Sequence, residues 1–145
     1  MATVNVYLTF NGNTEEAFNF YKSVFGGEFT YMGRFKDMPA DENCPPPSEE
    51  EGNRIMHVSL PISKETILMA SDSTSFSGDV TFGNNFSVSI NTDNKEEADR
   101  LFNGLSVGGN IIMPMEKTFW GAYFGMFTDK FGVNWMVNFD EVPAN

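Results

Sequence analysis

The sequence predicts an α+β fold built from two successive βαβββ modules. A first observation is that residues 13–27, NTEEAFNFYKSVFGG, return as NKEEADRLFNGLSVGG at residues 94–109. A second is that an alternating, strand-like segment precedes each copy and that further strand-like segments follow it. The alternating apolar positions are Val6, Leu8 and Phe10 before the first copy, and Phe86, Val88 and Ile90 before the second. Because these features recur in the same order, the pattern indicates an internal duplication.

Each repeated stretch is predicted to be an amphipathic helix, over about residues 14–25 and 95–105. An Asn opens each copy and a Glu stands three residues later, close to a capping box. These pairs are Asn13 with Glu16, and Asn94 with Glu97. Apolar residues then recur at helical spacing, and Gly26 and Gly108 supply the backbone freedom that a helix exit needs.

Eight strands are expected around these helices, four in each module. They are Val4–Phe10, Glu28–Phe35, Arg54–Leu60, Thr66–Ser71, Phe86–Ile90, Asn110–Met115, Ala122–Thr128 and Val133–Phe139. Residues 72–84, rich in Ser, Gly and Asp, read as a linker between module one, about 1–72, and module two, about 84–141.

Residues 36–53 interrupt the first module with an acidic, Pro-rich segment that has no periodicity. A Pro triplet cannot lie inside a helix or a central strand, so an excursion loop is predicted here. A solvated, mobile loop that proteases cut first is favoured over a lid across a binding cleft.

Composition narrows the class of protein. A length of 145 residues and fifteen Phe fit a single packed domain over 1–145. The formal net charge of −11 argues against nucleic acid and anionic membrane surfaces as partners. No signal peptide or transmembrane stretch is recognisable, and the single Cys44 cannot form an internal disulfide. A cytoplasmic location is therefore expected.

Three segments carry a resemblance to a known family: YLTFNGNTEEAFNFYKSVFGGE, RIMHVSLPISKETILMASD and FWGAYFGMFTDKFGVNWMV. Their order and spacing resemble the PhnB-like, demethylubiquinone methyltransferase-like branch of the vicinal oxygen chelate superfamily, which includes glyoxalase I, bleomycin-resistance proteins and extradiol dioxygenases. The resemblance covers nearly the whole chain except the acidic loop. It implies a glyoxalase/bleomycin-resistance-like fold, in which paired modules form curved mixed sheets around a cleft with the helices outside.

The resemblance also implies where a metal would bind. Metal-dependent relatives use cleft-facing His residues on the first strands and Glu residues on the last strands. At the matching positions this chain has Asn5, Asn85 and Met136. Amide oxygens are weak ligands, and a thioether suits hard or borderline cations poorly. We therefore expect no metal and no cofactor.

Strand alternation predicts which side chains face the cleft. If Val6, Leu8 and Phe10 face the helix, Asn5 and Tyr7 face the opposite side, as Asn85 and Ser87 do in the second module. Trp135 is expected in the core, whereas Tyr123, between Gly121 and Gly125, is expected where a ligand has room. The predicted ligand-binding residues are Asn5, Tyr7, Asn85, Ser87, Tyr123, Asn134 and Met136.

His57 is the only histidine, so any histidine-dependent chemistry must use it. Alternation predicts that it shares a strand face with Ile55 and Ser59. It is the candidate catalytic residue, as a general acid or base, and a hydrogen-bonded structural role is the alternative. Cys44 lies in the excursion loop, so no Cys-His pairing can be argued.

Three functions fit these observations, and whether the protein is an enzyme stays open. The first is metal-free binding of a small molecule in the cleft. The second is a lyase or isomerase with a non-standard metal site or with His57 as base. The third is a structural or regulatory homodimer, favoured by open sheet edges and by apolar residues in 110–115 with Phe119 and Trp120. Methyl transfer is not supported, because both Gly-Gly pairs follow helices instead of preceding them.

Overall fold

The computed structural model describes residues 2–39, 43 and 46–141 of the 145-residue chain. The chain forms two compact units, residues 1–81 and 82–145, each with its own four-stranded sheet. Whether 1–145 acts as one domain stays a prediction, as does a cleft between the modules. None of the helices in the described part is long and apolar enough to cross a membrane.

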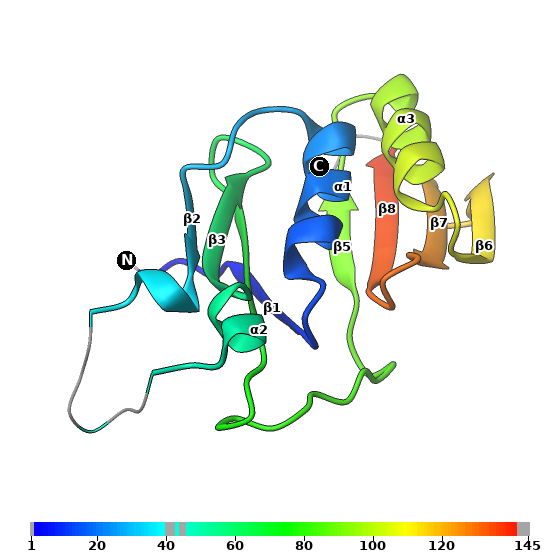
Figure 1. Ribbon diagram of the computed structural model, residues 1–145. Helices are drawn as coiled ribbons and strands as arrows, with labels where there is room; N and C mark the ends of the chain where they lie inside the picture. The colour runs from blue at the N-terminus through cyan, green and yellow to red at the C-terminus, as the bar shows by residue number, and fades with distance from the viewer. Residues whose placement is uncertain (1, 40–42, 44–45, 142–145) are drawn as a thin grey trace. The chain divides into compact units, whose positions relative to one another are not determined.

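The first unit contains four strands and three helical segments (Figure 1). In chain order they are β1 Val6–Phe10, α1 Thr14–Phe25, β2 Tyr31–Arg34, the 3₁₀ turn η1 Phe35–Asp37, α2 Glu49–Gly52, β3 Ile55–Pro61 and β4 Ile67–Asp72. The strand order across the sheet is β1-β4-β3-β2. β1 runs parallel to β4, and the other pairs are antiparallel.

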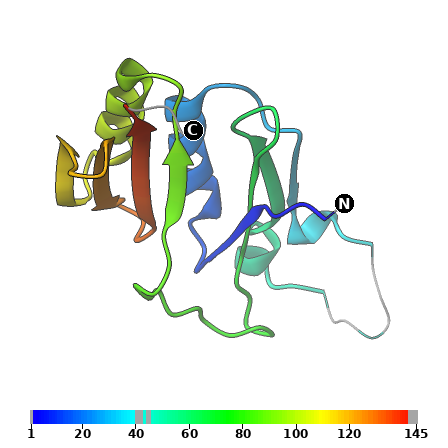
Figure 2. The same cartoon turned by 180° about the vertical axis from the view of Figure 1, so that it is seen from behind.

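The second unit repeats this arrangement (Figure 2). Its elements are β5 Val88–Asn91, α3 Lys95–Leu105, β6 Asn110–Lys117, β7 Ala122–Thr128 and β8 Asn134–Asp140. The strand order β5-β8-β7-β6 has the same topology, again with the first and last strands parallel. The predicted duplicated βαβββ modules and the α+β class are thus confirmed.

The core of the first unit lies between α1 and one face of its sheet. Ala17, Phe18 and Tyr21 project from α1 and are fully buried. The strands contribute buried apolar side chains, namely Leu8, Phe10, Val58, Leu60, Leu68 and Ala70. Burial of each large side chain stabilises the fold by about 1.5–3 kcal/mol. The opposite face of this sheet is not covered by α1, and Tyr7 and Tyr31 on it are half-exposed.

The core of the second unit is built in the same way around α3. Its buried side chains on α3 are Ala98, Leu101, Phe102 and Leu105. The rings of Phe102 and Phe127 meet edge to face, with centroids 5.1 Å apart. Trp135 is fully buried, which confirms its predicted core position, and its Nε1 donates to Asp129 Oδ2 at 2.8 Å.

The two helices begin differently although their sequences predict the same cap. The Asn94 side chain accepts a hydrogen bond from the Glu97 backbone N–H at 2.7 Å, so this cap is confirmed. The Asn13 side chain makes no capping hydrogen bond, so the equivalent prediction for α1 is wrong.

Asp72, the last residue of β4, takes over the cap of α1. Its Oδ1 accepts from the backbone N–H and the hydroxyl of Thr14, at 3.0 and 2.6 Å, and from Gly12 N–H at 3.0 Å. Its Oδ2 accepts from Ile55 N–H at 2.9 Å. The sequence placed Asp72 in the linker, but it is a buried carboxylate that joins the start of α1 to the start of β3.

The 36–53 segment is partly regular. The turn η1 and the helix α2 occupy its two ends, so a wholly irregular loop is wrong there. Ser48 Oγ accepts from Glu51 N–H at 3.2 Å and caps α2. Cys44 and residues 40–42 lie outside the described residues. A lid function and mobility of the loop stay predictions.

Candidate functional site

Polar and aromatic side chains occupy the sheet face of the first unit that α1 does not cover, here called the first open face. Strand pairing sets Tyr7 beside Met69, Met69 beside Ser59, Ser59 beside Tyr31, and His57 beside Gly33. The strand residues of this face are Tyr7, Thr9, Tyr31, Gly33, His57, Ser59, Pro61, Ile67, Met69 and Ser71. None of them is an acid, a lysine or an arginine, although the chain carries 20 acidic and 9 basic residues.

His57 lies at the centre of the first open face and uses both ring nitrogens. Its Nδ1 is 3.1 Å from Tyr7 Oη, and its Nε2 is 2.9 Å from Ser59 Oγ. A neutral imidazole has one donor and one acceptor nitrogen, whereas each hydroxyl can donate or accept. Tyr7 is 49% exposed, and Ser59 only 9%. The three side chains thus form a hydrogen-bonded chain that runs from the half-exposed Tyr7 to the nearly buried Ser59.

Two tyrosine rings flank the imidazole. The Tyr7 ring stacks on His57 with centroids 5.6 Å apart and an interplanar angle of 29°. The Tyr31 ring lies 5.8 Å from His57 at 42°. A Cβ atom on Gly33 would lie 2.5 Å from Tyr31 Oη, so the missing side chain is what lets this ring lie over β2.

A β-bulge changes the predicted face of Ile55. Gly33 pairs with His57 but the next residue, Arg34, pairs with Ile55, so Met56 is an extra residue on β3. Ile55 is consequently buried and does not share the face of His57, which corrects the alternation from the sequence.

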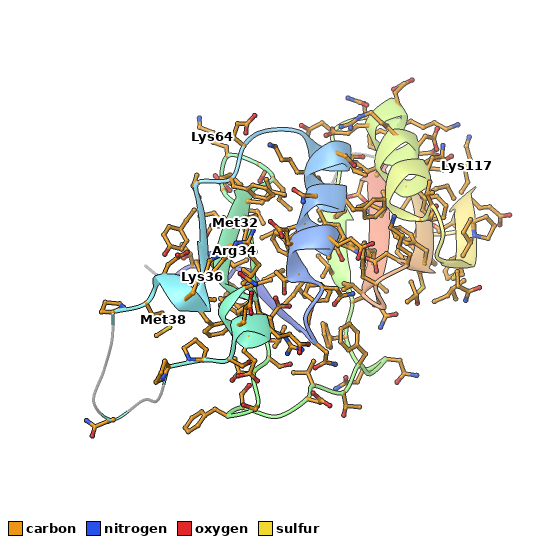
Figure 3. All side chains as sticks on the ribbon, viewed as in Figure 1. Met32, Arg34, Lys36, Met38, Lys64 and Lys117 are labelled. Atoms are coloured by element: carbon orange, nitrogen blue, oxygen red, sulfur yellow. The ribbon has the colours of Figure 1, made fainter. Side chains whose placement is uncertain are left out.

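Arg34 lies on the helix side of β2. Met32 and Arg34 lie two positions apart along this strand (Figure 3). Arg34 Nη2 lies 2.6 Å from Glu15 Oε2 on α1, and this hydrogen bond raises the pKa of the guanidinium. The bulge therefore separates a charged pair on the helix side from the uncharged first open face.

The side chain of Asn5 accepts a hydrogen bond from the backbone of the first unit. Its Oδ1 accepts from the Ile67 N–H at 3.1 Å, at the start of β4. Asn5 precedes β1, which begins at Val6 and not at Val4 as predicted. The amide oxygen that was expected to face a ligand is thus used to align β1 with β4.

In the second unit, Met136 lies on the sheet face that α3 leaves open. It pairs with Ser89 on β5 and with Met126 on β7, opposite to the buried Trp135 and Val137. Its predicted orientation is therefore correct. Ligand binding by Met136 stays a prediction.

The side chain of Asn134 forms hydrogen bonds within its own unit. Its Oδ1 accepts from Thr128 Oγ1 at 2.7 Å. Its Nδ2 donates to the carbonyl oxygens of Gly83 and Phe86, at 3.1 and 3.4 Å. These contacts fasten the segment before β5 to the start of β8, a role that the sequence did not reveal.

Asn85 and Ser87 lie before β5, because this strand begins at Val88 and not at Phe86. Asn85 is exposed in a bend, so strand alternation does not assign it a face. Phe86 is 60% exposed, contrary to its predicted place against the helix. The positions that the resemblance matched to histidine ligands, Asn5 and Asn85, therefore both lie outside the strands.

Tyr123 faces α3, so its predicted cleft-facing position is wrong. It pairs with Phe139, and its hydroxyl donates to Asp99 Oδ1 on α3 at 2.6 Å. Lys95 Nζ lies 4.8 Å from the centre of its ring. Gly125, on the same face, leaves room for the side chains of Phe102 and Met115 and not for a ligand.

The Tyr123–Asp99 hydrogen bond predicts a pH effect on stability. The bond, together with burial, raises the pKa of Tyr123 from 10.0 to about 12. The folded state keeps the phenol protonated where the unfolded state loses the proton. The stabilisation is thus complete below pH 10 and is lost as the pH rises towards about 12.

We expect Tyr123→Phe to lower the free energy of unfolding by about 1 kcal/mol at pH 7. Between pH 9 and pH 11 the urea midpoint should fall further for the wild type than for Tyr123→Phe. Equal falls in the two proteins would contradict the assignment.

Among the described residues, no three or more His, Cys, Asp or Glu side chains gather in a way that could hold a metal ion. The predicted absence of a metal stays a prediction. Tyr31 and Gly33 were missed from the site. Alternation along the predicted strand 28–35 would have put them on one face, but their pairing with Ser59 and His57 was needed to place them beside the imidazole.

Comparison with known proteins finds a matching family model and a relative that matches along almost the whole chain. A family model for 3-demethylubiquinone-9 3-methyltransferase matches residues 2–138. Protein YjdN of Escherichia coli (strain K12) is 35% identical over 141 residues, which cover 91% of each chain.

Solved structures agree with this family. The crystal structure of protein PA1353 from Pseudomonas aeruginosa is 42% identical, with a TM-score of 0.82 over 97% of this chain and 98% of that one. A putative 3-demethylubiquinone-9 3-methyltransferase, PhnB protein, from Bacillus cereus is 28% identical, with a TM-score of 0.71 over 95% and 99%.

More distant glyoxalase/bleomycin resistance proteins, at 16% and 13% identity, share the fold with TM-scores of 0.58 and 0.61. The repeated βαβββ topology and the match along almost the whole length point to the same assignment. The chain belongs to the 3-demethylubiquinone-9 3-methyltransferase family, and it shares the fold of glyoxalase/bleomycin resistance proteins.

Proposed function

We propose that the protein binds a small uncharged molecule on the first open face, without a metal ion. The observation that carries this proposal is the cluster of Tyr7, Tyr31 and His57, in which two half-exposed rings flank an imidazole that has hydrogen-bonded hydroxyl partners. Ligand sites are typically aromatic and apolar with a few placed polar groups. Aromatic contacts contribute about 0.5–1.5 kcal/mol beyond the area that they bury.

The charge distribution supports an uncharged ligand. The chain has a net charge of −11, yet the first open face has no acidic, Lys or Arg side chain on its strands. An anion would meet no cation there and would be repelled by the rest of the molecule. A cation would find no carboxylate on this face to pair with.

The proposal is tested with four small aromatic probes of similar size: acetophenone, phenol, benzoate and benzyltrimethylammonium. NMR titration of the ¹⁵N-labelled protein should show shifts at Tyr7, Met69 and His57 with the two neutral probes. The two charged probes should shift these signals less, and EDTA should change nothing. S-adenosylmethionine is added as a fifth probe, because the family carries a methyltransferase name.

Gly33→Ala supplies a matched pair of variants. The new methyl group would stand 2.5 Å from Tyr31 Oη, so the flexible ring must move away from His57. Loss of one aromatic contact should weaken the neutral probes about fivefold, which corresponds to ~1 kcal/mol. Gly83→Ala is the control, because a Cβ atom there makes an ordinary 3.5 Å contact with Asn85 Oδ1. No shift with either neutral probe at millimolar concentration, or binding that EDTA abolishes, would refute the proposal.

A second candidate function is proton transfer by a lyase or isomerase that uses His57 as base. The contacts of both ring nitrogens with hydroxyls favour it, since a general base must lie within hydrogen-bond reach of the proton that it moves. It predicts that His57→Gln abolishes turnover of any bound substrate while binding on the face persists.

Pairing into a homodimer is proposed separately, from the edge of the second sheet. Strand β6 is an edge strand on which Ile111 and Ile112 are 51% and 53% exposed, and Phe119 and Trp120 are exposed just beyond it. Unpaired strand edges with apolar side chains favour association. Sedimentation equilibrium should give about twice the monomer mass of 16.2 kDa.

A further inference from the structure

Three methionines form one cross-strand row on the second open face, the sheet face of the second unit that α3 does not cover. Met126 on β7 pairs directly with Met136 on β8 and with Met113 on β6. These three residues are called the methionine row. Side chains that pair directly across antiparallel strands share a sheet face, and their Cβ atoms are about 4.5–5.5 Å apart. The thioether of Met126 therefore has another thioether within reach on each side.

A break in the regular pairing of β6 is what places Met113 in the row. Ile111 pairs with Phe127, so regular pairing would set Ile112 opposite Met126. The register shifts between Ile111 and Met113, and Met113 takes this position instead. Bulges are frequent next to functional sites, where they turn a side chain towards the site. Here the shift exchanges an isoleucine for a third thioether.

Packing of the sheet alone does not explain three methionines in succession. The neighbouring row on the other face of these strands consists of Val88, Trp135, Phe127 and Ile111. These are the β-branched and aromatic residues that strands favour. Methionine differs from them in its unbranched, flexible side chain and its polarizable sulfur. The methionine row thus offers three sulfur atoms where the strands could have carried branched apolar residues.

The charges around the methionine row suit a cation. Among the paired strand residues of the second open face, Glu116 and Asp140 are acidic and none is Lys or Arg. The chain as a whole has a formal net charge of −11. A negative field raises the local concentration of cations. Met113 is 44% exposed, so an ion can reach the row from solvent.

We propose that the methionine row binds a soft monovalent cation, Cu(I), through the thioether sulfurs of Met113, Met126 and Met136. Soft sulfur ligands favour Cu(I), whereas hard cations prefer oxygen ligands. Each methionine has three rotatable bonds, so the sulfurs of the two outer residues can turn towards that of Met126. The register of the strands keeps the three side chains adjacent before any ion is bound.

This proposal goes beyond the expectation of no metal. That expectation concerned hard and borderline cations, which thioethers suit poorly. The same chemistry makes thioethers suitable for Cu(I), which is a different class of ion. The site also lies on the second unit, so it does not depend on ligand binding at the first open face.

Silver(I) is the first probe, because it is a soft monovalent cation that is stable in air. Cys44 could also bind it, so the titration uses the full chain with Cys44→Ser, labelled with ¹³C at the methionine methyl groups, in chloride-free buffer. We expect the methyl signals of Met113, Met126 and Met136 to shift together and to saturate at one Ag⁺ per chain. Mg²⁺ and Zn²⁺ should leave these signals unchanged, since Zn²⁺ binds sulfur as the thiolate of Cys.

Met126→Leu removes the central sulfur and keeps a side chain of similar size. It should weaken Ag⁺ by at least about tenfold, since even an outer-shell partner of a metal ligand is worth about 10–100-fold in affinity. Met113→Leu, at a more exposed position, should also weaken Ag⁺. Met69→Leu is the matched control, because Met69 pairs with Tyr7 and Ser59 and with no other methionine.

Cu(I) itself is tested without oxygen, in ascorbate, by competition with a coloured Cu(I) chelator. The Cys44→Ser protein should take Cu(I) from the chelator, and the added Met126→Leu change should weaken this by at least about tenfold. Three results would each overturn the proposal. They are Ag⁺ that leaves the three methyl signals unshifted, Zn²⁺ that shifts them as strongly as Ag⁺, and Met126→Leu that holds Ag⁺ or Cu(I) as tightly as Met69→Leu.

Discussion

Replacement of Asp72 by Ala should lower the free energy of unfolding by about 3–5 kcal/mol, the largest effect expected of any single change considered. The carboxylate accepts four hydrogen bonds, from three backbone N–H groups and one hydroxyl. Ala would leave these donors without their acceptor, and each buried unsatisfied group costs about 1–3 kcal/mol. The loss is not fully additive, because water can reach Gly12, which is exposed.

Asp140→Ala is the matched control for this prediction. Asp140 ends β8 as Asp72 ends β4, but it is exposed, and within the described part of the chain its side chain accepts one hydrogen bond, from Asn138 Nδ2 at 3.1 Å. Urea denaturation followed by circular dichroism should show a change within about 0.5 kcal/mol for the control. Comparable losses in the two variants would show that burial and the cap of α1 are not what make Asp72 important.

Replacement of Gly109 by Ala should cost about 2–3 kcal/mol, within the range for overpacking. A Cβ atom there would lie 2.2 Å from the carbonyl oxygen of Thr128 and 2.9 Å from Cα of Asp129. Both atoms belong to the backbone at the end of β7, so no side-chain rotation relieves the clash. The start of β6 must move away from β7 where Asn110 pairs with Thr128.

Gly83→Ala separates this clash from the general cost of a glycine replacement. Gly83 has no positive φ, and a Cβ atom on it would make an ordinary 3.5 Å contact with Asn85 Oδ1. We expect a change within about 0.5 kcal/mol. A Gly109→Ala variant that unfolds at the same urea concentration as Gly83→Ala would refute the close approach of β6 to β7.

The amino-acid sequence predicted the two long helices to the residue, because their signals are local. An apolar stripe at helical spacing fixes the middle of each helix, and α1 and α3 span the predicted 14–25 and 95–105. Strand ends were less well predicted: β1 and β5 begin two residues later than expected. Strands end where a neighbouring strand stops pairing, which a single segment does not encode.

The same limit explains the outcome at the candidate site. Alternation correctly oriented Tyr7 and Met136, since it needs only a regular strand. It failed for Ile55, where a bulge adds a residue to β3, and for Tyr123, whose face follows from its register with Phe139. Neither the bulge nor the register leaves a signal in the segment itself.

The repeated module shows most clearly what the sequence decided and what the tertiary structure decided. The sequence by itself determined the duplicated βαβββ order and the two long helices. Only the tertiary structure decided which side chain caps the N-terminus of each of the two helices. Asn94 caps its own helix. The start of α1 is capped instead by Asp72, 58 residues after Thr14, because the folded chain brings a stronger, charged acceptor to this helix start.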